Sequence, residues 1–589
     1  MTSRRRFLAA CSAAGVTSAL VPGALWARVQ QEGARRITVE MLDDALAVAG
    51  LQFNDDERRQ MANAINQNLE RYDELRKVAL DESLAPPMYF SPLVPGTRVD
   101  RTARPFRPTR PANIHRPARL EDVAFWPLTD LAELVRTRRV TSIELTEMYL
   151  ARLERLNPIL NCVVTLTPDL ARRQARQADQ EIAAGTYRGP LHGIPWGCKD
   201  IIAVPGYPTT WGSGAYQDQQ IETEATVVRL LRDAGAVLIA KLTTGELAAG
   251  DRWFGGRTNN PWNPKEGSSG SSAGPASATA AGCVAFAIGT ETSGSILSPS
   301  TVCGVTGLRP TFGRVSRHGA MTLSWSMDRL GPICRTAEDC ALVLHVIARP
   351  DEEDLSVIDL PFNWDAAADL RGLRVGYLAA AFDEEGRDAD WKRNDERALA
   401  ELRGLGVTLE AFELPALPLN ALGGILGAES GASFDHALRS GRLEKLTNRG
   451  RANGMRSSRL VPAVEYLQAQ RVRAQVMRQF AAAVSRFDVY IAPYMAMRGG
   501  TGGPPTPPGG STPPAGPPPQ QRPSVIRDHF QVANLCGYPA VSVPHGFTAD
   551  GLPTSITFLG RLYNETAILG LARAYQERAG WHRKTPSIG

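Results

Sequence analysis

The strongest constraint on the fold is an alternation of short β-rich runs with longer segments of helical periodicity, which begins near Leu128. The short runs lie at 236–240, 373–378, 489–492 and 540–543, among helical stretches such as 224–234 and 396–405. This alternation is typical of an α/β domain. With 589 residues, the chain is long enough for one large sheet-based domain with extensions, or for two or more domains.

Residues 28–117 predict a helical N-terminal extension that leads into an extended arm. Apolar residues recur at helical intervals from 37 to about 80, and Asn54 marks a helix start within that stretch. From 86 to 119 the chain is rich in interleaved prolines and arginines, which suits an extended segment lying over a surface. We interpret these arginines as solvated or locally paired charges.

The first 27 residues resemble a twin-arginine export signal. Three arginines at positions 4–6 precede a weakly apolar stretch, and Ala27 is a small residue suited to cleavage. Polar residues and Pro22 interrupt this stretch, whereas a membrane span needs about 18 consecutive apolar residues. We therefore expect a periplasmic or secreted protein without a stable membrane span.

The composition argues against nucleic-acid and metal partners. The formal net charge is +5, and three of the positive charges lie in the leader, so no nucleic-acid footprint is expected. The seven cysteines beyond the leader are scattered without C-x-x-C spacing, and no histidine lies in an H-E-x-x-H motif. A P-loop and a G-x-G-x-x-G turn are also missing, so neither a metal nor another cofactor is expected.

Residues 499–523 form a Pro/Gly-rich insertion, with ten prolines and seven glycines in 25 residues. Such a segment cannot bury a core, so it predicts a flexible surface loop. Because apolar segments resume at Val532, the loop is expected to interrupt a domain that spans 118–589.

Three Gly- and Ser-rich segments carry the chemistry. They are LHGIPWGCKD at 191–200, EGSSGSSAGPASATAAG at 266–282 and GTETSGSILSP at 289–299. One nominal G-x-S-x-G match is centred on Ser272, but a turn sequence precedes it where a nucleophile elbow needs a strand. The chain therefore offers a lysine and two serine loops in place of a serine–histidine pair.

These segments resemble the amidase signature family, from about Leu128 to about Tyr575. The other matching parts follow in the family's order: AKLTTGELA at 240–248, NPWNP at 260–264, CGVTGLRPTFGRVS at 303–316, NLCGYPAVSVPHGF at 534–547 and DGLPTSITFLGR at 550–561. Each part is weak alone, but their joint order is specific. The resemblance implies an α/β fold with a large mixed β-sheet core and helices on both faces.

By this resemblance Lys199 is the catalytic lysine, Ser295 the nucleophile, and Ser271 a bridging serine that follows a cis peptide bond. Gap-free spacing from both flanking motifs selects Ser271, whereas Ser268 and Ser269 would need a gap and are interpreted as loop residues. The resemblance also implies an oxyanion hole made by the backbone N–H groups of Thr292, Ser293, Gly294 and Ser295.

The residue types suit these roles. A lysine has an ordinary pKa of about 10.4, so it must be desolvated to accept a proton at neutral pH. Burial beside Ile194 and Trp196 could supply this desolvation. A serine bridge is suitable because its hydroxyl both donates and accepts a hydrogen bond.

The sequence departs from the family pattern at four positions. Ser293 replaces the first glycine of a Gly-Gly pair, and Ala273 replaces a glycine in the bridging-serine loop. Glu291 stands where many members have aspartate, and Leu297 where many have arginine. Because that arginine is missing, we expect a neutral or apolar acyl group rather than an anionic one.

We therefore expect an exported amidase that hydrolyses a small-molecule amide to an acid plus ammonia or an amine, through an acyl-Ser295 intermediate and without a cofactor. An A-type component of a tRNA-dependent amidotransferase is one alternative, and a hydrolase acting mainly on esters or carbamates is another. A catalytically inactive binding module is a third. The oligomeric state stays open, and a homo-oligomer is compatible with the sequence.

Overall fold

The structure, a computed structural model, describes residues 37–49, 51–62, 65, 88–494 and 524–588. The chain divides into two compact units, one made of Met1–Leu84 with Leu460–Glu465, the other of Ala85–Arg459 with Tyr466–Gly589. The predicted export signal at 1–27 and the predicted loop at 499–523 lie outside the described residues.

The smaller unit contains helix α3 (Val39–Ala49) and a second helix at 55–62. Asn54 caps the second helix, because its Oδ1 accepts hydrogen bonds from the N–H groups of Asp56 and Glu57, both 3.0 Å long. Leu42, Leu46 and Ala62 form a small apolar cluster between the two helices.

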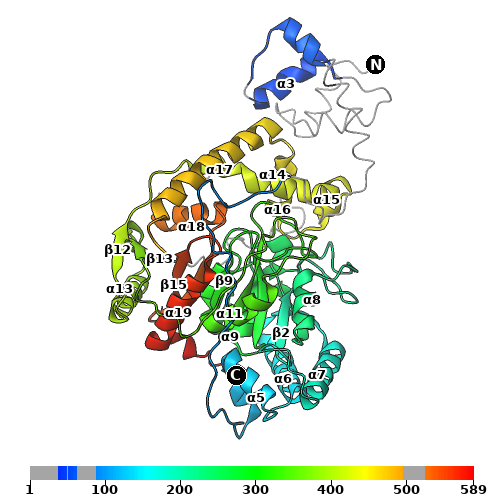
Figure 1. The fold of residues 1–589 in the computed structure, drawn as a ribbon. Coiled ribbons are helices and arrows are strands. Elements are labelled where there is room, and N and C mark those ends of the chain that lie inside the picture. Colours follow the sequence, from blue (N-terminus) through cyan, green and yellow to red (C-terminus); the bar gives the residue numbers. More distant parts are fainter. Residues whose placement is uncertain (1–36, 50, 63–64, 66–87, 495–523, 589) are drawn as a thin grey trace. The chain divides into compact units, whose positions relative to one another are not determined.

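The larger unit is built on an 11-stranded sheet with the order β1-β3-β2-β8-β10-β9-β14-β15-β13-β11-β12. Figure 1 labels β2, β9, β15, β13 and β12 of this sheet. The strands are β1 Val163–Leu166, β2 Pro195–Lys199, β3 Val237–Leu242, β8 Phe286–Glu291, β9 Thr306–Arg309, β10 Arg329–Cys334, β11 Val375–Leu378, β12 Leu409–Phe412, β13 Val489–Pro493, β14 Ala540–Phe547 and β15 Pro553–Gly560. Two short hairpins lie apart from it: β4 Arg252–Trp253 with β5 Gly256–Arg257, and β6 Asn259–Asn260 with β7 Asn263–Gly267.

The sheet is mixed. β2 runs parallel to β3 and β8, and β11 runs parallel to β12 and β13, while the strands between β8 and β13 pair antiparallel. Every residue of β2, β3, β8 and β10 is buried, so both faces of the sheet are covered there. The predicted fold class, an α/β domain with a large mixed sheet and a helical N-terminal region, is confirmed.

The larger unit also contains a series of helices. They are α5 Leu128–Arg136, α6 Ser142–Leu160, α7 Pro168–Ala183, α8 Thr226–Asp233, α9 Ala273–Ala280, α10 Leu297–Cys303, α11 Ala337–Ile347, α12 Ala379–Phe382, α13 Ala389–Gly404, α14 Gly424–Ser433, α15 Asp435–Arg439, α16 Arg449–Ser458, α17 Ala463–Val484, α18 Val525–Leu535 and α19 Glu565–Ala579. α6 begins with a capping box, because Thr141 and Glu144 exchange side chain-to-backbone hydrogen bonds. In the part of the chain that the structure describes, no helix is both long and apolar enough to cross a membrane.

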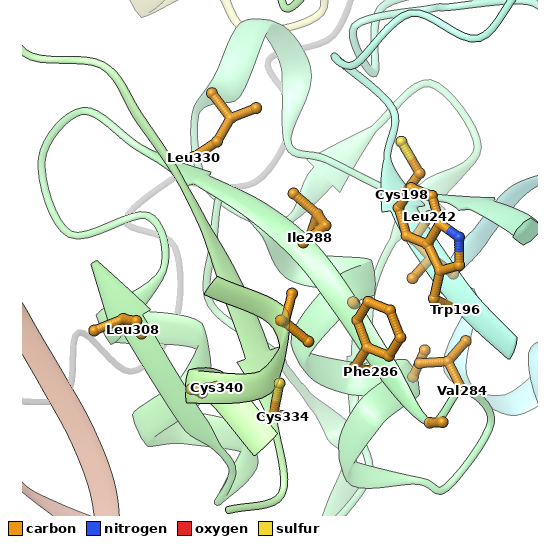
Figure 2. Packing of buried hydrophobic residues seen from close by; sticks show 14 of the residues in the cluster. Trp196, Cys198, Leu242, Val284, Phe286, Ile288, Leu308, Leu330, Cys334 and Cys340 are labelled. Atoms are coloured by element: carbon orange, nitrogen blue, oxygen red, sulfur yellow. The ribbon is translucent and has the colours of Figure 1, made fainter. Parts of the chain in front are cut away.

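The core around β2, β8 and β10 places the site. Trp196 and Cys198 of β2 pack beside Phe286 and Ile288 of β8, and the rings of Trp196 and Phe286 stack with centroids 6.0 Å apart (Figure 2). Because these strands are held rigidly, the residues at their carboxyl ends have fixed positions. Lys199 and Glu291 are those two end residues.

The arm belongs to the larger unit and packs against other parts of it. The backbone of Arg107 pairs with residues 364–366, and the rings of Phe106 and His345 stack 3.9 Å apart. The backbone N–H and the hydroxyl of Thr109 both donate to the carboxylate of Glu338. The arm is therefore tied to the fold by backbone and side-chain hydrogen bonds.

Candidate active site

Lys199 is a fully buried cation at the end of β2. Its Nζ donates to Ser271 Oγ at 2.8 Å and to Thr290 Oγ1 at 2.8 Å, with the carbonyl oxygen of Thr290 at 3.4 Å. Burial lowers the pKa of Lys199 to about 7, although Asp328 and Glu291 act in the opposite direction. The amine is therefore able to lose its proton near neutral pH.

Ser271 follows a cis peptide bond with Gly270, as the resemblance predicts. The neighbouring serines are engaged elsewhere. Ser272 Oγ donates to the carbonyl oxygen of Thr290 and accepts from its N–H, both at 3.1 Å, while Ser269 Oγ pairs with Ser298 Oγ at 2.9 Å. Among these serines, Ser271 is the one in hydrogen-bond contact with Lys199.

Ser295 lies in the turn between β8 and α10. Its carbonyl oxygen accepts a hydrogen bond of 3.0 Å from the N–H of Ser272. This bond places the turn directly against the residue that follows Ser271. The fold thus brings together Lys199, Ser271 and Ser295 from three separate parts of the chain.

The turn has free donors. Among the described residues, no hydrogen bond uses the backbone N–H of Ser293, Gly294 or Ser295. Gly294 has φ +91°, a value that strains any residue with a side chain, whereas Ser293 is outside the left-handed region. The serine in place of the first family glycine is therefore tolerated, and only the second position requires glycine.

Glu291 anchors this turn at its base. Its Oε2 accepts from the N–H groups of Ile296 and Leu297 at 2.8 and 3.0 Å, and its Oε1 accepts from Arg309 at 3.1 Å. Burial would raise the pKa of Glu291, but Arg309 and these N–H groups outweigh it and lower the pKa. Leu297 itself is fully buried in an apolar cluster.

Two further residues contact the site without having been identified from the sequence. Thr290 holds Lys199 through its hydroxyl, and Asp328 accepts a 2.6 Å hydrogen bond from Thr292 Oγ1. Strand alternation in β8 could have pointed to Thr290, because Phe286, Ile288 and Thr290 share one face. Asp328 could not have been found in this way, since it lies in a separate loop that only the fold brings to Thr292.

Nothing in the described residues suggests a metal centre. No group of three or more His, Cys, Asp or Glu side chains is placed to hold a metal ion there. The seven cysteines at 162, 198, 283, 303, 334, 340 and 536 are free thiols, and all are buried.

A buried lysine with a lowered pKa, a serine hydroxyl in contact with it, and a second serine beside unoccupied N–H donors are the groups that acyl transfer requires. Comparison with known proteins supports this chemistry. The family model for amidases matches residues 144–569. The chain belongs to the amidase family. It is an enzyme of the class that acts on carbon–nitrogen bonds other than peptide bonds.

The curated relatives of this amidase-family chain include two proteins of one enzyme type. It is 35% identical to the A component of the glutamyl-tRNA(Gln) amidotransferase of Methylococcus capsulatus in an alignment of 494 residues, which covers 78% of this chain and 98% of the relative. The identity to the same component in Dechloromonas aromatica is also 35%, over 492 residues, with the same coverage. These relatives are covered almost in full, so about a fifth of this chain has no counterpart in them.

Among solved structures, the peptide amidase from Stenotrophomonas maltophilia is similar, with a TM-score of 0.67 and 29% identity over 79% of this chain and 99% of the other. The A component of the glutamyl-tRNA(Gln) amidotransferase from Thermotoga maritima has a TM-score of 0.64 at 24% identity, over 78% of this chain and 96% of the other, which shows a shared fold. Both comparisons agree with the mixed sheet described above.

Proposed function

We propose that the chain cleaves a carboxylic amide through an acyl-Ser295 intermediate. The observation that carries this proposal is the 2.8 Å hydrogen bond between Lys199 Nζ and Ser271 Oγ in a fully buried environment. Neutral Lys199 accepts the proton of the Ser271 hydroxyl, and Ser271 in turn accepts the proton of the Ser295 hydroxyl. At the same time Ser295 Oγ attacks the carbonyl carbon of the amide. The oxyanion that forms is held by the N–H groups at 292–295.

The proton then returns along the same path. Lys199 and Ser271 deliver it to the amide nitrogen as the carbon–nitrogen bond breaks, and ammonia or an amine leaves. Water then attacks the acyl-Ser295 ester and loses a proton to the relay, which returns it to Ser295 Oγ as the ester bond breaks and the acid departs. Esters and carbamates undergo the same acyl transfer, so they stay alternative substrates of this site.

Replacement of the three residues tests this chemistry. Ser295→Ala, Ser271→Ala and Lys199→Met should each lower kcat/KM by about a hundredfold or more, as measured on a panel of amides, esters and carbamates. Ser268→Ala is the matched control, since Ser268 Oγ donates only to the neighbouring carbonyl of Ser269. A fluorophosphonate that fails to label Ser295, or full turnover by Ser295→Ala, would overturn the proposal.

The curated relatives favour a second reading over a stand-alone exported amidase. Both of these relatives are amidotransferase A components, so the chain can be proposed to release ammonia within a complex with other proteins. The two readings differ in what the purified chain does alone. Amide hydrolysis at full rate by the isolated chain supports the stand-alone amidase, whereas activity that requires co-purifying partners supports the amidotransferase reading.

Export stays a separate proposal, and it rests on the twin-arginine pattern at positions 4–6 and the small residue Ala27. Fractionation of cells that express the tagged full chain tests it. Mature protein that begins near position 28 outside the cytoplasm is expected. A cytoplasmic product that keeps Met1 would contradict export and fit the amidotransferase reading.

A further inference from the structure

Tyr494 lies directly in front of the turn that carries Ser295. It follows the last residue of β13, on the opposite half of the sheet from Lys199. The hydroxyl oxygen of Tyr494 is 3.4 Å from the point where a Cβ of Gly294 would be. Because Gly294 carries no side chain, the hydroxyl end of Tyr494 bounds the space over this residue.

The ring is held firmly in place. Tyr494 is 6% exposed, and its ring packs edge-on against Phe530 of α18 with centroids 4.6 Å apart. It belongs to the same apolar cluster as Leu297 and Met327. A side chain that is packed in this way cannot swing aside without opening a cavity.

The hydroxyl end of Tyr494 is uncharged at any pH at which the enzyme would work. Burial raises the pKa of Tyr494 and Glu291 adds to this, while Arg309 and the hydroxyl of Ser298 act in the opposite direction. Ser298 lies three residues beyond Ser295, and its N–H donates to the carbonyl oxygen of Gly294 at 2.8 Å. Tyr494 therefore lies beside Gly294 and Ser298, which flank the proposed nucleophile.

The residues around Tyr494 are largely apolar. Leu297 is fully buried where many amidases carry arginine, and it belongs to the same apolar cluster as Tyr494. A charged or long substrate group over Gly294 would have to displace these side chains or lose its hydration. A short apolar group fits without that cost.

We propose that Tyr494 is a specificity-determining residue that limits the substrate group lying over Gly294 to a short, apolar one. This inference rests on the proposed acyl transfer at Ser295. Tyr494→Ala removes the ring and opens the space, whereas Tyr494→Phe keeps the ring and removes only the hydroxyl. The two variants therefore remove side-chain volume beside Gly294 to different extents.

The test uses alkyl fluorophosphonates of increasing chain length on the full chain, with labelling of Ser295 followed by mass spectrometry, and unfolding midpoints measured in parallel. In the wild type the labelling rate should fall steeply as the alkyl chain lengthens, and in Tyr494→Phe it should fall less steeply, because the hydroxyl is the atom nearest to Gly294. In Tyr494→Ala the long-chain to short-chain rate ratio should rise at least tenfold.

Each other result is decisive. If the long-chain to short-chain rate ratio is equal in wild type and Tyr494→Ala, the inference is overturned. Labelling of Ser295 by short-chain probes in that case leaves the proposed function intact. If the long-chain to short-chain rate ratio rises as much in Tyr494→Phe as in Tyr494→Ala, the steric role of the Tyr494 ring is overturned. No labelling of wild-type Ser295 by any probe rejects the proposed function, and the inference falls with it. If Tyr494→Ala does not fold, Tyr494→Leu replaces it under the same criteria.

Discussion

The amine of Lys199 lies in a buried environment that disfavours a positive charge. It is fully buried, and its hydrogen-bond partners are two hydroxyls and a carbonyl, without a carboxylate in direct contact. The nearby acids Asp328 and Glu291 only partly compensate, so the pKa falls to about 7. This is the condition that a lysine needs in order to act as a base near neutral pH.

The pH dependence of the reaction follows from this pKa. Below about 7 Lys199 holds its proton and cannot accept another, so kcat/KM should fall about tenfold for each further pH unit. Above about 7 the amine is neutral, and the rate should level off. The profile is measured on a substrate without ionisable groups, and a flat profile between pH 5 and 8 would contradict the role of Lys199.

The lowered pKa of Lys199 also affects folding stability. Protonation of the buried amine destabilises the folded state, whereas the charge of a lysine in an ion pair usually stabilises it. The folded state binds the proton of Lys199 more weakly than the unfolded state, whose lysine has its ordinary pKa of 10.5. Between pH 10.5 and 7 each unit of decreasing pH therefore costs about 1.4 kcal/mol of folding free energy. Below about 7 both states are protonated, and the cost stays constant.

Lys199→Met should therefore stabilise the fold. After the loss of two hydrogen bonds, the net gain is about 2 kcal/mol at pH 7.5, and it should shrink as the pH rises towards 10. Urea unfolding at several pH values measures this. Lys265→Met, at an exposed lysine, is the control and should show no such trend. A Lys199→Met variant less stable than wild type at pH 7.5 would show that the burial cost is overestimated.

At the scale of elements, the turn between β8 and α10 depends on one carboxylate. Glu291 ends β8, and it accepts the N–H groups of Ile296 and Leu297 at the start of α10. Arg309 at the end of β9 neutralises it, and Asn534 of α18 donates to the same oxygen at 3.3 Å. Four elements thus meet at the residue that shapes the proposed oxyanion hole.

Glu291→Gln should weaken both stability and turnover. It leaves the buried Arg309 without its charged partner, which costs about 3 kcal/mol or more at pH 7. Because the pKa of Glu291 is lowered in the folded state, its contribution to folding stability is fully present above pH 4.5. That contribution is lost as the pH falls through the pKa of Glu291 in the folded state. The difference in the free energy of unfolding between Glu291→Gln and wild type, measured by urea unfolding, should therefore become smaller at acid pH.

Glu413→Gln is the matched control for that measurement, since Glu413 is exposed. It should unfold like the wild type at every pH. A Glu291→Gln variant whose stability equals that of wild type at pH 7 would contradict the role of the Glu291–Arg309 pair.

A second connection between elements runs through Asp328. This residue accepts from Thr292 Oγ1 and from the N–H groups of Leu323 and Ser324. Glu429 of α14 in turn accepts from Ser324, from Ser326 and, at 2.9 Å, from the hydroxyl of Tyr466 in α17. Helices α14 and α17 are therefore linked to the turn at 292–295 by a chain of hydrogen bonds.

At the scale of the whole molecule, the two halves of the sheet contribute different parts of the site. β2 and β8 carry Lys199 and Thr290, while β13 leads into Tyr494. The sheet continues without a break from β1 to β12, so these groups are held in one frame. The N-terminal helices, by contrast, have an apolar cluster of their own made of Leu42, Leu46 and Ala62.

Deletion of residues 1–84 should therefore leave the unfolding midpoint of the larger unit and the rate of amide cleavage unchanged. Deletion of 1–119 should lower the midpoint, because Phe106 and Thr109 then no longer pack on His345 and Glu338. Thermal unfolding and activity of both truncated chains measure this. Loss of activity on the shorter deletion would assign a function to the N-terminal helices.

The sequence by itself determined the fold class and proposed three residues for the site. Strand and helix periodicity is a local property, so the α/β alternation was visible, and the ordered motifs placed Lys199, Ser271 and Ser295 in one family pattern. The tertiary structure showed that Ser271 contacts Lys199, and it added Thr290 as a second hydroxyl partner of the amine. It also decided how far the pKa of Lys199 falls, and it placed Asp328 and Tyr494 beside the turn. Those facts depend on burial and on contacts between distant segments, which a local pattern does not contain.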